Sequence, residues 1–315
     1  MHESTSFRSK YELLGLLGTG GMGVIYKARQ TVLNKIVAIK MLHPHLVSAE
    51  SLQRFQVEGR AASVLSHPNI VAVYDFGMND MGQPYMVMEF VEGKTLAGVL
   101  AEQGPLNSAQ FRSVFVQVCD ALTHAHKRSV LHRDVKPSNI MIVRGDNDQE
   151  QVRIMDFGIA KLVSESDSQD LTRTGEAIGS PAYMSPEQGR GTAIDQRSDI
   201  YSLGCVMYES LTGAPPFTGK TAMDTMLRHL QDKPLPLSQA SLGKRFPSGL
   251  EHMIMRMLEK DPAARYQSMD EVKNDLLAGG TAAPQSDAAD RKRDWRPFGY
   301  AAGAVAGVLA LWIGT

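Results

Sequence analysis

The sequence predicts an α+β fold, in which a small strand-rich lobe precedes a larger helical lobe and a C-terminal transmembrane helix follows. Three observations lead to this prediction. Apolar runs with β-branched residues dominate up to about residue 91, helical spacing of apolar residues prevails beyond Gly93, and the last 19 residues carry no charge. The predicted parts are a polar lead-in at 1–10, one two-lobed domain at 11–277 with lobes at about 11–90 and 93–277, a flexible linker at 278–296 and the transmembrane helix at 297–315.

Each expected element follows from a short run of residues. Apolar runs rich in β-branched residues predict strands where glycine or polar residues bound them. A helix is expected where Leu52, Phe55, Ala62 and Leu65 recur at roughly helical spacing. The expected strands are 11–18, 24–28, 35–42, 70–77 and 84–91, and the expected helices are 48–66 and, in the second lobe, 109–128.

The bulk composition excludes some classes of function. Lys plus Arg is 33 and Asp plus Glu is 34, so the net charge is −1, whereas nucleic-acid binding usually needs a basic excess; no nucleic-acid partner is expected. The two cysteines, Cys119 and Cys205, are isolated, which favours a reducing compartment without a disulfide framework. The first ten residues contain no apolar run, so no signal peptide is predicted.

The uncharged segment 297–315 predicts a single membrane span. Its 19 residues would form a helix of roughly 28 Å, close to the hydrocarbon thickness of a bilayer. The preceding RKRDWR (291–296) carries four positive charges and one negative, which places the two-lobed domain on the cytoplasmic side of the membrane. A buried or frayed terminal helix is the alternative, and a span here fits either a tail anchor or part of a longer protein.

Glycines recur every four residues within this segment, at Gly299, Gly303 and Gly307. Such a face of small residues can pair two membrane helices, so one expectation is a homodimer. The alternative is that glycines are simply common in membrane helices.

The run GTGGMG (18–23) is the first of five short motifs. By itself a G-x-G-x-x-G run is weak evidence, because it occurs in dinucleotide-binding turns and in ordinary tight loops. A dinucleotide fold needs a helix directly after the last glycine, whereas Val24, Ile25 and Tyr26 favour a strand. A hairpin tipped with glycines can bring its backbone close to phosphate groups. The residues expected to bind the nucleotide here are Leu17, Gly18, Thr19, Gly20, Gly21, Met22, Gly23, Val24 and Ile25.

Four further motifs follow in order: VAIK (37–40), HRDVKPSN (132–139), DFG (156–158) and SPE (185–187). HRDVKPSN is the most specific, because it sets a carboxylate, a cation and an amide within six residues. A lone loop aspartate more often makes a local turn, and a lysine at the end of a strand is usually just solvated. The order and spacing of all five motifs resemble the protein kinase signature set.

Residues 11–277 resemble a eukaryotic-type (Hanks-type) serine/threonine protein kinase, and GTGGMGVIYKA and GSPAYMSPEQ are most similar to its bacterial branch. The resemblance implies the bilobal protein kinase fold and ATP-dependent phosphoryl transfer to serine or threonine of protein substrates, with Mg²⁺ (or Mn²⁺) as the metal. Together with the apolar C-terminal segment, it implies signalling at the cytoplasmic membrane.

The resemblance also assigns roles in the nucleotide site. Lys40 would orient the α- and β-phosphates while paired with Glu58 of the following helix. The adenine ring would be bound by Ala38, by Met88 at the gatekeeper position, and by the backbone of Glu89 and Val91.

The catalytic roles that the resemblance implies belong mainly to HRDVKPSN. Asp134 would accept the proton of the substrate hydroxyl, and Lys136 would neutralise the transferring phosphoryl group. Asn139 and Asp156 would bind Mg²⁺, because hard oxygen ligands suit this ion. Asp199 would brace the backbone of the catalytic loop.

The polar segment between DFG and SPE resembles an activation loop. Thr172 and Thr174 are the expected phosphorylation sites, and Arg133 is the expected partner of the phosphate. Two residues depart from the family pattern: Ser180 stands where threonine is usual, and Ser185 replaces the alanine of the APE motif.

Two other classes of function compete with this interpretation. A pseudokinase scaffold would bind without catalysis, but every expected catalytic side chain is present in the sequence. A small-molecule phosphotransferase of related fold would lack the SPE segment, which this chain has. The substrate proteins, the activating signal, the loop residue that is phosphorylated and any sensor domain beyond Thr315 are left open.

Overall fold

The computed structural model describes residues 6–20, 23–47, 52, 59, 62–145, 149–157 and 181–279. They belong to one compact unit, Met1–Ala282, and the second unit, Ala283–Thr315, contains no described residue. Among the described helices, none combines the length and the apolar character that crossing a membrane requires. The predicted span and nearly all of the predicted linker lie outside the described residues, so both remain predictions.

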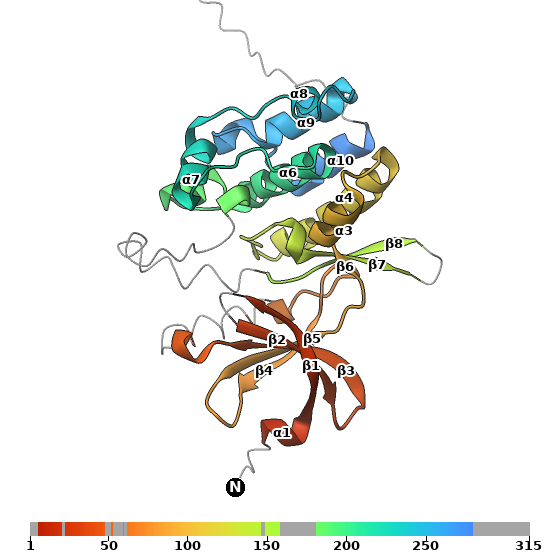
Figure 1. The fold of residues 1–315 in the computed structure, drawn as a ribbon, viewed down its shortest axis with the longest axis vertical. Helices are drawn as coiled ribbons and strands as arrows, with labels where there is room; N and C mark the ends of the chain where they lie inside the picture. The colour runs from red at the N-terminus through yellow and green to blue at the C-terminus, as the bar shows by residue number, and fades with distance from the viewer. Residues whose placement is uncertain are drawn as a thin grey trace, which may run out of the picture. The chain divides into compact units, whose positions relative to one another are not determined.

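A five-stranded antiparallel sheet forms the first lobe (Figure 1), as the strand-rich sequence predicts. Its strands lie in the order β1-β2-β3-β5-β4, so β3 is central. The expected helix at 48–66 is described only in part, with positions 52, 59 and 62–63 helical. The strands are β1 (Tyr11–Gly20), β2 (Gly23–Gln30), β3 (Lys35–Leu42), β4 (Val73–Met78) and β5 (Pro84–Glu89).

The central strand β3 presents alternate side chains to two different apolar clusters. Its even-numbered residues include Ala38 and Leu42, which pack with Met86 and Met88 of β5. Lys40 lies between them on the same face, so a cation is set within an apolar surface. The opposite cluster consists of Val37, Ile39, Met41, Tyr85 and Val87 with Phe7, Tyr11 and Ala28.

A short helix, α1 (Phe7–Lys10), lies within the segment that the sequence marks only as a polar lead-in. Phe7 is buried, and its ring centroid lies 4.8 Å from that of Tyr85. The hydroxyl of Ser6 and the N–H of Phe7 both donate to the carboxylate of Asp80, at 2.7 and 3.1 Å. One turn of helix gives no periodic pattern, so this element depends on contacts with the sheet.

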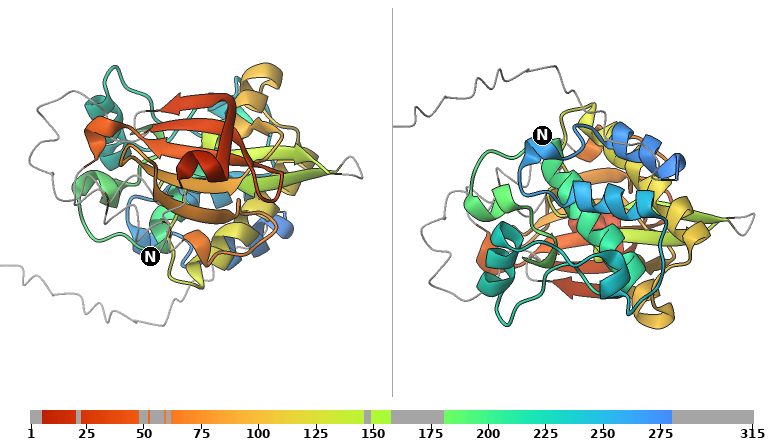
Figure 2. Two further views of the ribbon diagram at one scale, coloured as in Figure 1. Left: turned by 90° about the horizontal axis from the view of Figure 1, so that it is seen from below. Right: turned by 90° about the horizontal axis from the view of Figure 1, so that it is seen from above.

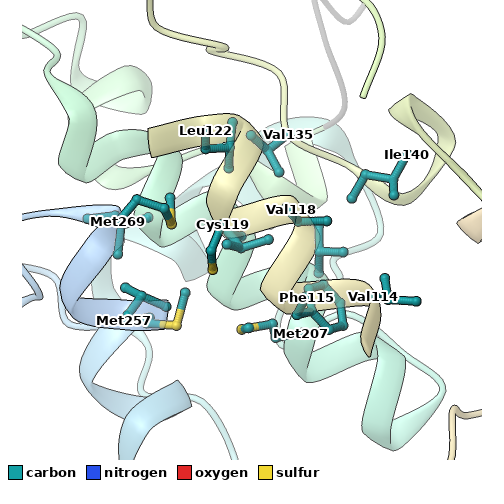
Figure 3. Close-up of a cluster of buried hydrophobic side chains, with 14 of the residues drawn as sticks. Val114, Phe115, Val118, Cys119, Leu122, Val135, Ile140, Met207, Met257 and Met269 are labelled. Atoms are coloured by element: carbon teal, nitrogen blue, oxygen red, sulfur yellow. The ribbon is translucent and has the colours of Figure 1, made fainter. Parts of the chain in front are cut away.

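The second lobe is built around α4 (Ser108–His126) and α6 (Gln196–Thr212), and α4 matches the expected helix at 109–128. Helix α9 (Ser248–Met257) packs on α6, and α10 (Met269–Leu277) packs on α4 (Figure 2). Figure 3 shows part of the core, where Phe115, Cys119 and Leu122 gather with Met207 and Met257. The other helices are α3 (Leu96–Gln103), α5 (Pro186–Arg190), α7 (Ala222–Gln231) and α8 (Leu237–Ala240), with 3₁₀ turns at Pro44–Leu46, Pro137–Asn139, Pro181–Tyr183 and Pro262–Ala264.

A second sheet, which the sequence does not predict, has three antiparallel strands in the order β6-β7-β8. They are β6 (Lys94–Thr95), β7 (Ile140–Arg144) and β8 (Glu150–Ile154). The β7–β8 hairpin is visible as two yellow-green arrows in Figure 2. It joins HRDVKPSN to DFG along the chain, and the N–H of Met155 donates to the carbonyl of Asn139, so the two motifs lie side by side at the open end of the hairpin.

The outer edge of β8 is bonded by groups that do not belong to a strand. The carboxamide of Gln117 on α4 accepts from the N–H of Val152 and donates to the carbonyl of Glu150, both at 3.0 Å. The N–H of Ile154 donates to the carbonyl of Asn69 at 2.8 Å, and the side-chain amide of Asn69 donates to the carbonyl of Val152 at 2.9 Å. These bonds fix the strand that leads into DFG.

Candidate active site

The glycine-tipped hairpin joins β1 to β2, where Gly20 pairs with Gly23. A Cβ on Gly23 would lie 2.1 Å from the carbonyl oxygen of Met41, so the close approach of β3 requires this glycine. Among the described residues, a Cβ on Gly18 or Gly20 would meet nothing within 4 Å, so packing against this part of the chain does not explain these two glycines. Leu17, Thr19, Val24 and Ile25 lie on the same two strands, whereas Gly21 and Met22 lie outside the described residues.

The expected adenine-binding residues lie on one apolar face of the sheet. Ala38 pairs with Met88 across β3 and β5, and both side chains are buried. Ile25 and Val91 pack against the same cluster. The N–H of Glu89 donates to the carbonyl of Ala72 at 2.9 Å, so this N–H is already bonded within the protein.

Lys40 forms an ion pair with Asp156, the first residue of DFG. Its Nζ lies 2.7 Å from Oδ1, and the two side chains are 11% and 19% exposed. Burial raises the pKa of Asp156, but the charge and hydrogen bond of Lys40 outweigh burial, so the pKa lies below its usual value. The predicted partner of Lys40, Glu58, lies outside the described residues, and that pair therefore remains a prediction.

Asp199 of α6 holds the backbone of the 132–139 segment. Its Oδ1 accepts the N–H of Arg133, and its Oδ2 accepts the N–H of His132 and the ring N–H of His126, all at 2.8 Å. Burial raises the pKa of Asp199, but the hydrogen bond and charge of His126, together with the hydrogen bond from the backbone N–H of His132, outweigh burial and lower it. This is the bracing contact that the resemblance implies.

His132 connects the 132–139 segment to DFG. It is fully buried, its Nε2 donates to the carbonyl of Met155 at 3.1 Å, and its ring centroid lies 4.7 Å from that of Phe157. Burial lowers the pKa of His132, which favours the neutral ring. In this tautomer Nδ1 accepts the N–H of Asp134 at 3.3 Å.

Two polar side chains of the 132–139 segment, those of Lys136 and Asn139, meet at Asp134. The Nζ of Lys136 lies 2.7 Å from Oδ2 of Asp134, and the two side chains are 21% and 15% exposed. The Nδ2 of Asn139 donates to the same oxygen at 3.2 Å and to the carbonyl of Asp134 at 2.9 Å. Because its nitrogen faces Asp134, the carboxamide oxygen of Asn139 is the atom that can face a cation.

Asn139 and Asp156 are the residues that could hold a metal ion. The N–H of Met155 donates to the carbonyl of Asn139 at 3.0 Å, which keeps the two segments adjacent. A carboxamide oxygen and a carboxylate oxygen suit Mg²⁺, so the donors present fit this ion. In the described part of the chain, no three His, Cys, Asp or Glu side chains converge as a metal site. Mg²⁺ in nucleotide sites usually takes one or two protein ligands together with phosphate oxygens and water.

Arg133 has a left-handed backbone, with φ 63°, which is unfavourable for a residue with a Cβ. Its Nη1 is buried and has no hydrogen-bond partner among the residues that the structure describes. Thr172, Thr174 and Ser180 lie outside the described residues, so the pairing of Arg133 with a phosphothreonine remains a prediction.

The SPE motif is anchored by a buried ion pair. Glu187 accepts two hydrogen bonds from Arg265, at 2.8 and 2.9 Å, and a third from the hydroxyl of Ser198 at 2.6 Å. Burial raises the pKa of Glu187, but Arg265 and then Ser198 outweigh burial and lower it. The pair fixes α5 to the helical lobe, which is a structural role.

The sequence profile of the protein kinase domain family matches residues 11–277. The chain belongs to the protein kinase family. The kinase is 40% identical to the serine/threonine-protein kinase pkn3 of Myxococcus xanthus over 285 residues, which cover 90% of this chain and 52% of that protein. It is 41% identical to the serine/threonine-protein kinase PknB of Mycobacterium tuberculosis over 272 residues, which cover 85% of this chain and 42% of that protein.

The kinase is also similar to a solved structure, that of the PknI kinase domain of Mycobacterium tuberculosis. The TM-score is 0.67 at 27% sequence identity, and the match covers 86% of this chain and 96% of that chain. The matched part of this chain covers 52% of the length of pkn3 and 44% of the length of a second relative, the PknB of Mycobacterium leprae. The predicted family, a bacterial Hanks-type serine/threonine protein kinase, is confirmed, as are the bilobal fold and the enzyme class.

Two residues of the kinase site are not singled out from the sequence. His126 bonds to Asp199, and Gln188 donates to the carbonyl of Arg133 at 2.9 Å. A local signal exists for Gln188, because Ser185-x-x-Gln188 has the spacing of a capping box. Its bond to a residue 55 positions earlier has no local signal.

Proposed function

We propose that this kinase transfers the γ-phosphoryl group of ATP to serine or threonine hydroxyls of proteins. The observation that carries the proposal is the arrangement around two carboxylates: Asp134 is held beside Lys136 and Asn139, while Lys40 is held against Asp156. A proton acceptor, two cations and two oxygen ligands for a metal are thus supplied by one site. A binding scaffold has no need of this set.

The substrate hydroxyl gives its proton to Asp134 as its oxygen attacks the γ-phosphorus. The bond from that phosphorus to the β–γ bridging oxygen breaks, and ADP leaves. Lys136, whose Nζ lies 2.7 Å from Asp134, stabilises the charge on the phosphoryl group during transfer. Asp199 and His132 keep Asp134 in place, through the backbone bonds described above.

The nucleotide lies under the glycine hairpin, with its adenine on the face that carries Ala38 and Met88. The ammonium of Lys40 contacts the α- and β-phosphates, and in this proposal Glu58, which lies outside the described residues, pairs with Lys40. Asn139 and Asp156 would hold Mg²⁺ (or Mn²⁺), which would supply positive charge against the phosphates of the nucleotide.

Phosphorylation of the kinase itself is part of the proposal. A phosphate on Thr172 or Thr174 carries about −1.5 to −2 charges near neutral pH, and a guanidinium can bind it with two hydrogen bonds. Arg133 supports this role, because its Nη1 is buried without a partner in the described part of the chain. A phosphate bound there would link the residue that carries it to Arg133, the residue before Asp134.

Incubation of the purified chain with labelled ATP and Mg²⁺ tests the function and the phosphosites together. We expect label on the kinase and on an added protein substrate, with phosphoserine and phosphothreonine after hydrolysis and no phosphotyrosine. Peptide mapping by mass spectrometry should find phosphate on Thr172, on Thr174 or on both.

The Asp134→Asn variant is the control for contaminating kinases. Label that persists at the wild-type level in this variant, or no label in the wild type, would contradict the transfer activity. Label confined to small molecules in a mixture of phosphoryl acceptors would favour a small-molecule phosphotransferase, and phosphate found only outside 159–185 would reject the activation-loop proposal.

We also propose that the kinase works at the cytoplasmic face of a membrane, to which residues 297–315 anchor it as a single span. The support is in the sequence alone: 19 uncharged residues follow the basic cluster 291–296. Gly299, Gly303 and Gly307 would allow two spans to pair, which raises the local concentration of kinase domains and favours phosphorylation in trans.

Cell fractionation checks the anchor. The full chain should sediment with membranes and resist extraction with alkaline carbonate, because a spanning helix is held by its apolar length. A version that ends at Gly280 should stay in the soluble fraction. If both forms are soluble, residues 297–315 do not anchor the kinase.

A further inference from the structure

The left-handed residue before Asp134 is bound from two sides. Asp199 accepts the N–H of Arg133 at 2.8 Å. On the other side, the carboxamide nitrogen of Gln188 donates to the carbonyl of Arg133 at 2.9 Å. An unfavourable backbone conformation persists only where its surroundings hold it, and these two bonds hold the two peptide groups that flank Arg133.

The second of these peptide groups links Arg133 to Asp134. Its carbonyl is bonded to Gln188, and its N–H donates to the carbonyl of His132 at 2.8 Å. The orientation of this peptide sets the direction in which the Asp134 side chain leaves the backbone. Gln188 therefore acts on the carboxylate at a distance of one peptide group.

Gln188 is itself oriented by Ser185. Its Oε1 accepts the N–H and the hydroxyl of Ser185, at 3.0 and 3.2 Å, and its own N–H donates to that hydroxyl at 3.4 Å. With Oε1 committed to Ser185, the carboxamide nitrogen must point toward Arg133. Ser185 is 1% exposed, so water does not compete for these bonds.

This arrangement gives a reason for the serine in SPE, the residue that departs from the family's alanine. An alanine would keep the backbone N–H but would lose the hydroxyl, which bonds both the carboxamide oxygen and the N–H of Gln188. We propose that Ser185 and Gln188 are a pair of positioning residues for Asp134: Ser185 orients the carboxamide, and the carboxamide holds the peptide before the catalytic carboxylate. The proposal rests on the phosphoryl-transfer function proposed above.

Steady-state kinetics of the full chain test this role. Gln188→Met keeps the length of the side chain and removes its N–H, so kcat should fall about 10- to 100-fold, the loss typical of a misplaced catalytic group, while KM for ATP stays within about twofold. Ser185→Ala should lower kcat less, by about threefold. The double variant should match Gln188→Met alone, because Ser185 acts through Gln188.

Gln196→Met is the matched control. Its carboxamide nitrogen also donates to a backbone carbonyl, that of Gln267 at 2.6 Å, but it lies at the start of α6 and not at the 132–139 segment. This variant should keep kcat within about twofold. If Gln188 only caps its helix, Gln188→Met should lower the Tm and leave kcat unchanged, and that outcome would overturn the proposal. The proposal would also be overturned if the kcat loss in the double variant were the product of the losses in the two single variants.

Amide hydrogen exchange separates this proposal from the function on which it rests. The N–H groups of Arg133 and Asp134 should exchange faster in Gln188→Met than in the wild type or in Gln196→Met, whether or not the chain phosphorylates a given substrate. Equal exchange in all three proteins contradicts the positioning role. Absent phosphoryl transfer in the wild type contradicts only the proposed function.

Discussion

The Asp134→Asn variant should lose about 10²- to 10⁴-fold in kcat, the range for loss of a positioned base. Lys136 and Asn139 both hold Oδ2 of Asp134, and the carboxamide oxygen of an asparagine can keep these two contacts. The variant then presents an NH₂ group where the wild type has its other carboxylate oxygen. An amide nitrogen cannot accept the proton of the substrate hydroxyl, so the chemical step is lost and the fold is kept.

Three measurements check this expectation. Single-turnover transfer should be slow in the variant, calorimetric titration should give nearly the same affinity for ATP, and the Tm should change little. Asp261→Asn is a suitable control, because that aspartate caps a 3₁₀ turn by accepting the N–H of Ala263 and lies outside the 132–139 segment. Near-normal turnover in Asp134→Asn would show that another group accepts the proton.

The Lys40→Met variant should lose about 10²- to 10³-fold in kcat, the range for loss of one preorganised charged donor. Methionine has a similar length but no charge, so it cannot orient the phosphates. It also leaves the carboxylate of Asp156 without its ion-pair partner, at a position where that side chain is 19% exposed. Because water reaches this site, the unpaired carboxylate should lower the free energy of unfolding only a little. Circular dichroism should therefore show a folded protein.

Lys35→Met provides the comparison on the same strand. Lys35 begins β3 and donates to the hydroxyl of Tyr74 at 2.8 Å, and as an odd-numbered residue it leaves the strand on the opposite face from Lys40. Its replacement should change kcat by less than about twofold. A folded Lys40→Met variant with full activity would mean that another cation orients the phosphates.

Much of the first lobe could be predicted because its strands are long and apolar. The runs at 11–18, 24–28 and 35–42 each give most of a real strand, and β3 reads as continuous apolar sequence because both of its faces are covered. The strands β7 and β8 have only five residues each; three of those in β8 are polar, whereas β7 is an apolar run that ends in Arg144. The two strands pair with each other, β8 also bonds to Gln117, and no local pattern encodes such contacts.

The contacts of the site also fall into those that a local motif predicts and those that it does not. Asp134, Lys136 and Asn139 lie within six residues, so their meeting follows from the motif. The bond between Lys40 and Asp156 joins residues 116 positions apart, and only the folded chain brings them together. The family resemblance supplied a different partner for Lys40, Glu58, which the described residues do not include. An ion pair between residues so far apart in the sequence can be assigned only when the fold is known.

The edge of β8 has a consequence for how the protein behaves in a crowded solution. Unpaired strand edges can recruit strands from other molecules, and this is a common beginning of aggregation. On β8 the groups that would do so are already bonded, to the carboxamide of Gln117 and to Asn69. Gln117 and Asn69 thus take the place of a neighbouring strand, and β8, which leads into DFG, does not offer these bonded groups for self-association.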